Sequence, residues 1–134
     1  MPSHSPTIVV VEDDASMSKA IGTILRAGGF TPLMFASAEA ALELDVAKMA
    51  DCLVLDIMLP GMSGFDLYRR LAFFGADVPA IFITAHDEAP VREEAERIGP
   101  NSCFIPKPFS GRTLLEAVAQ ALGRQLEQRN EDQR

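Results

Sequence analysis

The chain has 134 residues, of which 48% are hydrophobic, as is typical of one globular domain with its own core and not of a disordered chain. Its net charge is −7, from 12 basic and 19 acidic residues, so a chain-wide basic surface is absent and direct nucleic-acid binding is not expected. No apolar stretch approaches the roughly 20 residues that span a bilayer, and residues 1–6 lack the pattern of a signal peptide. We therefore expect no membrane partner and a cytoplasmic location. Cys52 and Cys103 form no CxxC pair and border apolar runs, which favours small buried thiols over a metal site.

Short apolar runs bounded by turn signals recur along the chain, and each predicts a buried strand. The predicted strands fall at residues 7–11, 30–35, 52–56, 79–84 and 103–105. Apolar residues at helical spacing follow each run and predict a helix with one inner face. The expected inner faces are Met17, Ile21, Ile24 and Leu25; Leu42, Val46 and Met49; Leu67, Leu71 and Phe74; Val91, Ala95 and Ile98; and Leu114, Val118, Leu122 and Leu126.

Residues that begin and end helices agree with these elements. Ser37 and Ser110 are plausible N-caps, and glycines follow the first, third and fourth helical patterns. Strand and helix alternate five times, which with right-handed crossovers predicts an α/β fold with a doubly wound, five-stranded parallel sheet. The flavodoxin-like (βα)5 arrangement, with strand order 2-1-3-4-5, is the natural choice at this length. We expect the domain to occupy residues 7–127, after a disordered segment 1–6 and before a polar tail or linker start at 128–134.

The segment from Leu53 to Gly64 is the one around which the chain is organised. An apolar run leads directly into Asp56, which would lie at the carboxyl end of the third strand, where open α/β sheets bind their ligands. Pro60 and Gly61 then break the chain, and Ser63 with Gly64 prepares the next helix. An aspartate after a strand is by itself usually a turn or cap residue. Its role therefore depends on its partners.

Polar residues also follow the other strands that meet at this edge. Glu12 and Asp13 follow the first strand, Thr84 ends the fourth, and Lys107 follows the fifth. Three carboxylates in one cleft repel each other, and a hard divalent cation such as Mg²⁺ relieves that repulsion. A hydroxyl and an ammonium suit the oxygens of a transferring phosphoryl group. Lys107 precedes a proline, and such a bond can be cis, which would aim the side chain inward.

With these motifs in place, the sequence resembles the response-regulator receiver domains of two-component signalling. The resemblance covers about residues 7–126 and is carried by the acidic pair in VVVEDD, by LDIMLPGMSG, by IFITAHD and by FIPKPF. It implies that Asp56 accepts a phosphoryl group from the phosphohistidine of a sensor histidine kinase or a histidine phosphotransfer protein. It also implies a signalling switch and not an enzyme, since the domain would assist only its own phosphorylation and dephosphorylation.

The resemblance implies a role for each matching residue. Glu12 and Asp13 would hold Mg²⁺ together with Asp56 and the backbone carbonyl of Met58. Thr84 and Lys107 would contact the phosphoryl oxygens. Phe104 matches the switch aromatic of the family, which turns inward as Thr84 moves, although plain core filling is the simpler role for a phenylalanine.

The chain departs from the family pattern in a few places. Glu12 stands where aspartate is commoner, which keeps the charge. The link from Thr84 to Lys107 is one residue longer than usual, and residues 99–102 replace a typical Gly-Ala. The resemblance therefore does not fix the geometry between the fourth helix and the fifth strand. Met58 and His86 occupy the two variable positions that influence the lifetime of the phosphoryl group in relatives. His86 could modulate hydrolysis, but a solvated loop histidine is the simpler reading.

Other functions fit the sequence less well. A phosphatase with an aspartyl nucleophile would need a second acid two residues after Asp56, where Met58 stands. A nucleotide or flavin module would want a glycine- or hydroxyl-rich loop after the first strand, and neither GxxxxGK nor GxGxxG is present. A phosphorylation-independent scaffold receiver is the remaining alternative, which the intact five-residue site disfavours.

The expected output is a change in the face formed by the fourth helix, the fifth strand and the fifth helix, which would act on a downstream protein target or an effector domain. The resemblance also allows a homodimer that forms on phosphorylation.

Overall fold

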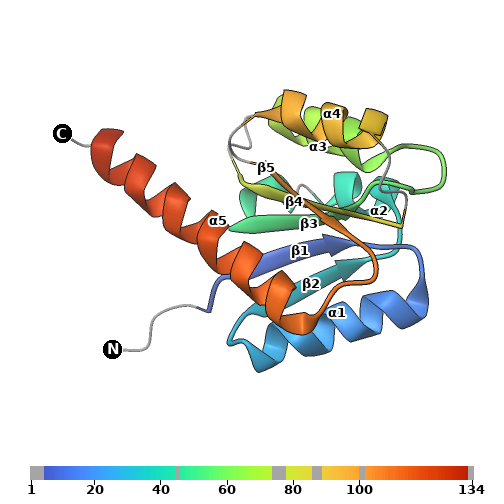
Figure 1. The fold of residues 1–134 in the computed structure, drawn as a ribbon, viewed down its shortest axis with the longest axis horizontal. Coiled ribbons are helices and arrows are strands. Elements are labelled where there is room, and N and C mark those ends of the chain that lie inside the picture. The colour runs from blue at the N-terminus through green and yellow to red at the C-terminus, as the bar shows by residue number, and fades with distance from the viewer. Residues whose placement is uncertain (1–4, 45, 74–77, 86–88, 100–101, 133–134) are drawn as a thin grey trace.

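Five parallel strands form a single sheet with helices on both faces in the computed structural model (Figure 1). The structure describes residues 5–44, 46–73, 78–85, 89–99 and 102–132. The strand order is β2-β1-β3-β4-β5, which confirms the predicted fold class. The strands are β1 (Thr7–Val11), β2 (Thr31–Phe35), β3 (Cys52–Asp56), β4 (Ala80–Thr84) and β5 (Ser102–Pro106). The helices are α1 (Ala15–Ala27), α2 (Ala38–Glu43), α3 (Gly64–Phe73), α4 (Ala89–Ile98) and α5 (Gly111–Asp132), with a short 3₁₀ helix η1 (Val46–Lys48).

Two hydrophobic cores lie on opposite faces of this sheet. Successive residues of a strand point to opposite faces, so Ile8 and Val10 pack under α1 and α5, whereas Val9 and Val11 pack under α2, α3 and α4. Every residue of β3 and β4 is buried because both strands are covered on both sides. This is why these strands read as continuous apolar runs in the sequence.

The predicted second helix is wrong in its extent. Helix α2 ends at Glu43, and Val46 reaches the core from η1 instead of from a continued α-helix. Met49, which we expected on the inner face, is 45% exposed. The interruption resets the helical phase, so the spacing of four residues no longer keeps Met49 on the buried side.

The two cysteines differ from each other. Cys52 is fully buried in β3, as predicted, whereas Cys103 is only partly buried because β5 lies at the edge of the sheet. The expectation of two buried thiols is therefore wrong for Cys103.

Both ends of the domain are more ordered than the sequence predicted. Ser5 and Pro6, which we placed in a disordered segment, make hydrogen bonds: Ser5 Oγ donates to the Gly29 carbonyl at 2.7 Å, and Thr31 N–H donates to the Pro6 carbonyl at 2.9 Å. Helix α5 continues to Asp132, so most of the polar segment expected as a tail is helical, and it projects beyond the sheet in Figure 1.

Phe74 of the predicted third helix falls outside the described residues. Among the helices that the structure describes, none combines the length and the apolar character needed to cross a membrane.

Candidate functional site

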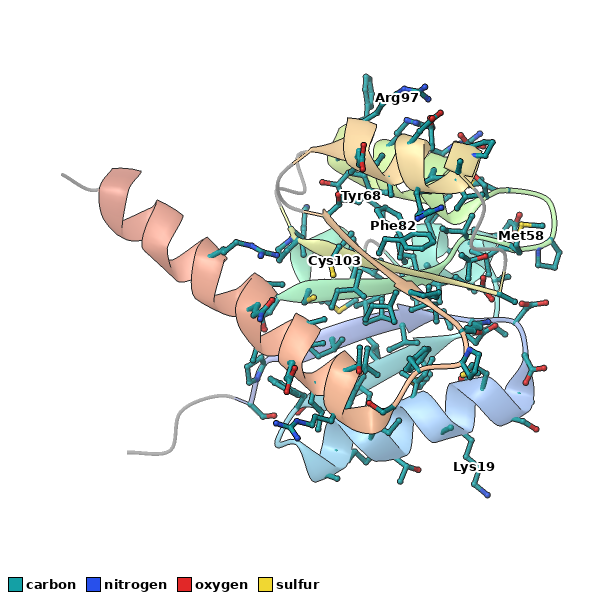
Figure 2. All side chains as sticks on the ribbon, in the orientation of Figure 1. Lys19, Met58, Tyr68, Phe82, Arg97 and Cys103 are labelled. Carbon is teal, nitrogen blue, oxygen red and sulfur yellow. The ribbon has the colours of Figure 1, made fainter. Side chains whose placement is uncertain are left out.

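Residues from four strands meet at the carboxyl edge of the sheet, which Met58 marks in Figure 2. Glu12 follows β1 directly, Asp56 and Thr84 are the last residues of β3 and β4, and Lys107 comes directly after β5. Glu12, Asp56 and Thr84 are almost completely buried, with 1%, 4% and 0% of their surfaces exposed. The parallel sheet thus gathers these residues as the order of strands predicts.

The ammonium group of Lys107 joins two of the carboxylates. Its Nζ donates to Glu12 Oε1 at 2.9 Å and to Asp56 Oδ2 at 3.0 Å. The backbone N–H of Lys107 also donates to the Thr84 carbonyl at 2.7 Å, which fixes the start of the segment after β5 to the end of β4. The peptide bond between Lys107 and Pro108 is cis. Lys107 is therefore held at the site by both its backbone and its side chain.

The remaining carboxylate oxygens accept backbone hydrogen bonds. Glu12 Oε2 accepts from the N–H of Asp14 at 3.1 Å, and Asp56 Oδ1 accepts from the N–H of Met58 at 2.9 Å. Asp14 also caps α1, because its side chain accepts from the N–H of Met17 at 2.8 Å. Each of the two buried carboxylates thus has both oxygens engaged, which fixes its orientation.

The three carboxylates of Glu12, Asp13 and Asp56 form a candidate cation site. Each offers an oxygen atom that lies within 4.8 Å of the other two. Asp13 is exposed, so the cluster opens to solvent on its side. A groove of about 400 Å³ between α1 and β2 begins at Glu12 and Asp13. A small cluster of carboxylates that faces solvent fits a hexacoordinate Mg²⁺ that keeps some of its waters.

Electrostatics at the site agree with that fit. Burial, helped by the hydrogen bond and repulsion with Asp56, raises the pKa of Glu12 to about 7, although Lys107 acts against this. Burial opposes the charge of Lys107, but its hydrogen bonds to the two carboxylates outweigh this and raise its pKa above the ordinary value. The site holds three carboxylates and one ammonium, so a bound cation would reduce its excess of negative charge.

Two residues acquire a role here that the sequence did not disclose. Asp14 orients Glu12 through its backbone N–H, and its only sequence signal is its place just before a helical pattern. Gly64, the first residue of α3, lies against the backbone of Asp56: a Cβ atom at this position would be 2.4 Å from the Asp56 carbonyl oxygen. Only its place before a helix marked it in the sequence.

Met58 and Phe104 are the other predicted residues that the structure describes. Met58 is 56% exposed, and its N–H makes the contact with Asp56 described above; the predicted role of its carbonyl as a Mg²⁺ ligand stays a prediction. Phe104 on β5 is partly buried, packs against the core under α4, and lines a groove of about 500 Å³ between α4 and β5. His86 lies outside the described residues.

Comparisons with known proteins agree with this architecture. The family model described as "Response regulator receiver domain" matches residues 8–119. Nodulation protein W of Bradyrhizobium diazoefficiens is 39% identical over 127 residues, which are 95% of this chain and 56% of that protein. The transcriptional regulatory protein FixJ of Azorhizobium caulinodans is 34% identical over 100% of this chain and 63% of its own length. The chain thus spans 56% and 63% of the lengths of these two relatives.

Solved structures give the same result. A response regulator receiver protein from Burkholderia phymatum is 40% identical, with a TM-score of 0.77 over 89% of this chain and 96% of that one. A receiver domain protein from Methanospirillum hungatei has a TM-score of 0.84 over 93% of this chain and 99% of that one. The latter is 23% identical and supports the fold alone.

Proposed function

This chain belongs to the family of response-regulator receiver domains, and from that premise we propose that it is a phospho-accepting switch of a two-component phosphorelay, with Asp56 as the acceptor. The observation that carries the proposal is the buried carboxylate of Asp56, held between the Lys107 ammonium and the Met58 N–H beside two further acids. A side chain fixed in this way is a positioned nucleophile with counter-charges close to the oxygens that will receive negative charge.

The chemistry would be a single phosphoryl transfer. A carboxylate oxygen of Asp56 attacks the phosphorus of a phosphohistidine, the bond between phosphorus and the imidazole nitrogen breaks, and its electron pair leaves with the imidazole. The product is an acyl phosphate on Asp56 and a histidine on the donor. Glu12, Asp13, Asp56 and the Met58 carbonyl would hold Mg²⁺, which when bound supplies positive charge to the phosphoryl oxygens.

Lys107 would change partners during this reaction. Before transfer its ammonium neutralises part of the charge on Glu12 and Asp56. After transfer the phosphoryl oxygens carry more negative charge than the carboxylate did, so the ammonium would bond to one of them. Thr84 ends the neighbouring strand and would donate its hydroxyl to another phosphoryl oxygen.

The output would follow from those new contacts. If Thr84 and Lys107 reach the phosphoryl group in only one of two packings, phosphorylation favours that packing. Phe104 lies on β5 beside α4 and would report the change to the face formed by α4, β5 and α5. Reversal of a 1:99 population needs about 5.5 kcal/mol of differential contact. Two or three charge-assisted hydrogen bonds could supply much of it.

The partners would be a sensor histidine kinase or a histidine phosphotransfer protein on one side and a downstream protein or effector domain on the other. Two relatives, FixJ and DctD, are named as transcriptional regulatory proteins, and this chain matches 63% and 26% of their lengths. An effector domain in the same polypeptide is therefore part of the proposal, as is a homodimer through the face formed by α4, β5 and α5.

Intact mass spectrometry after incubation with acetyl phosphate tests the proposal. We expect the gain of one phosphoryl group that requires Mg²⁺ and disappears in Asp56→Asn. Asp66→Asn is the matched control, because Asp66 is an exposed aspartate near the start of α3, and it should retain the gain. No gain in the wild type with either acetyl phosphate or a phosphorylated histidine phosphotransfer protein would favour a scaffold receiver. A gain that survives in Asp56→Asn would show that the acceptor is wrong.

A further inference from the structure

Helix α3 begins in direct contact with the end of β3. Gly64 is buried, and its N–H donates to the Ile57 carbonyl at 3.0 Å. A Cβ atom at Gly64 would lie 2.4 Å from the carbonyl oxygen of Asp56, 3.0 Å from its carbonyl carbon and 3.1 Å from Ile57 Cα. All three are backbone atoms, so no side-chain rotation could relieve the clash.

The need for glycine here is spatial and not conformational. Gly64 does not have the left-handed φ that favours glycine, unlike Gly29 or Gly61. Ordinary contact begins at 3.4 Å, so any larger residue would force α3 and the end of β3 apart by about 1 Å.

The end of β3 has little freedom to absorb such a shift. Ile57 N–H donates to the Ile83 carbonyl at 2.9 Å, and Asp56 pairs with Ile83 in the parallel register. The Asp56 carboxylate is at the same time fixed between Met58 and Lys107. A displacement of the Asp56 backbone would therefore also displace its carboxylate relative to Lys107 and the other acids.

We propose that Gly64 is a positioning residue of the phosphoryl-transfer site: its lack of a side chain lets α3 pack on the Asp56 carbonyl and fixes where the acceptor carboxylate points. This inference rests on the proposed function. A misplacement of about 1 Å can reduce a rate on the order of 100-fold in enzyme sites that depend on alignment. We therefore expect Gly64 to affect the transfer rate as well as the fold.

The start of α5 offers a matched control. Gly111 is the first residue of α5, as Gly64 is of α3, and each follows a serine whose Oγ accepts an N–H in the first turn. The three atoms nearest to a Cβ at Gly111 are side-chain atoms of Ile24, at 3.3 Å and more, and not backbone atoms of a site residue. Alanine is a better helix former than glycine, so helix propensity alone would not disfavour either substitution.

The experiment compares Gly64→Ala with Gly111→Ala. Phosphorylation of Asp56 is followed by intact mass at saturating Mg²⁺ and saturating acetyl phosphate, and the folded fraction is measured by circular dichroism. We expect Gly64→Ala to react at least tenfold more slowly at an unchanged folded fraction, and Gly111→Ala to stay within twofold of the wild type. Equal rates for the two folded variants would overturn the proposal.

A second pair keeps the inference testable if Gly64→Ala does not fold. Ser63→Ala removes the cap that holds the first turn of α3, where Ser63 Oγ accepts from Asp66 N–H at 3.1 Å, without adding bulk. Ser110→Ala removes the equivalent cap of α5, at 3.0 Å from Thr113 N. We expect a two- to fivefold slower transfer for Ser63→Ala and no change for Ser110→Ala. Equal rates would overturn the inference.

Calorimetric titration with MgCl₂ separates this inference from the proposed function. If the wild type takes up no phosphoryl group, the proposed function fails, but the position of Asp56 still governs the cation site. Magnesium binding that is at least tenfold weaker in Gly64→Ala than in Gly111→Ala would support the positioning role. Equal affinity would refute it.

Discussion

Replacement of Lys107 by methionine removes the ammonium that joins two buried carboxylates and keeps an unbranched side chain. Lys107 Nζ lies 2.9 Å from Glu12 Oε1 and 3.0 Å from Asp56 Oδ2. The side chains of Lys107, Glu12 and Asp56 are 16%, 0% and 6% exposed. Solvent can therefore replace little of the lost interaction, and we expect the metal-free variant to be strongly destabilised.

The magnitude follows from the cost of an uncompensated buried charge. Removal of one partner of a buried ion pair costs about 3–5 kcal/mol. Glu12, whose pKa is already raised to about 7, limits this cost, because loss of Lys107 raises that pKa further and the carboxyl group takes up a proton. We therefore expect a loss of about 3 kcal/mol at pH 7, the lower end of the range.

The pH dependence of this loss has a definite sign. The folded-state pKa of Glu12 lies above its unfolded value, so the folded variant binds more protons than the unfolded chain between the two values. The free energy of unfolding therefore falls as pH rises through this window, by up to about 1.4 kcal/mol per pH unit for one group. The variant should lose more at pH 8 than at pH 6.

Urea unfolding followed by far-UV circular dichroism at pH 6, 7 and 8, with and without Mg²⁺, measures the effect. Lys19→Met is the control, because Lys19 is exposed on α1 (Figure 2) and its replacement should change stability by less than about 0.5 kcal/mol. Mg²⁺ should stabilise Lys107→Met more than the wild type, since a cation then replaces the missing ammonium. If Lys107→Met loses no more than Lys19→Met at every pH, the ammonium does not hold the site together.

Three further predictions concern Glu12, Phe82 and the two cysteines. The free energy of unfolding of the metal-free wild type should fall as pH rises from about 4.5 to about 7, because burial raises the pKa of Glu12 to about 7. Glu12→Gln or saturating Mg²⁺ should flatten this pH dependence, and an equal pH dependence in Glu12→Gln would refute its attribution to Glu12. Phe82→Leu should cost about 1–3 kcal/mol in urea unfolding, because Phe82 is fully buried and packs its ring at 4.8 Å from that of Phe65, and a loss below 0.5 kcal/mol would contradict this. Burial raises the pKa of Cys52 to about 12, so Cys52 should react with a thiol reagent at pH 8 at least 100-fold more slowly than the partly exposed Cys103. Reaction of both thiols in a single fast phase would contradict this prediction.

The fold was predictable because its signals are local. Strands β3 and β4 are covered on both faces, so nearly every residue in them is apolar and the runs are visible without any knowledge of their partners. The error at Met49 has the same origin: helical spacing assumes an unbroken helix, and the change from α2 to η1 altered the phase. Periodicity cannot show that a helix has stopped and another has begun.

Which residues gather at the site was predictable from topology, but how they pair was not. Parallel strands deliver Glu12, Asp56 and Lys107 to one edge in any sheet of this order. The bond between Lys107 and Glu12 joins residues 95 positions apart, and its existence depends on side-chain reach at that edge. The sequence shows three acids and a lysine, whereas the structure shows that two of those acids share the lysine.

Gly64 shows what a list of polar residues leaves out. A glycine before a helix suggests conformational freedom, yet here it supplies space, and that space matters only because α3 packs on the carbonyl of Asp56. The approach of a helix to a strand is a property of the tertiary structure, and no local pattern discloses it. The proposed phosphoryl transfer therefore asks for more than the five polar residues of this site: we expect a chain with all five and a bulky residue at position 64 to hold the Asp56 carboxylate about 1 Å from its present place.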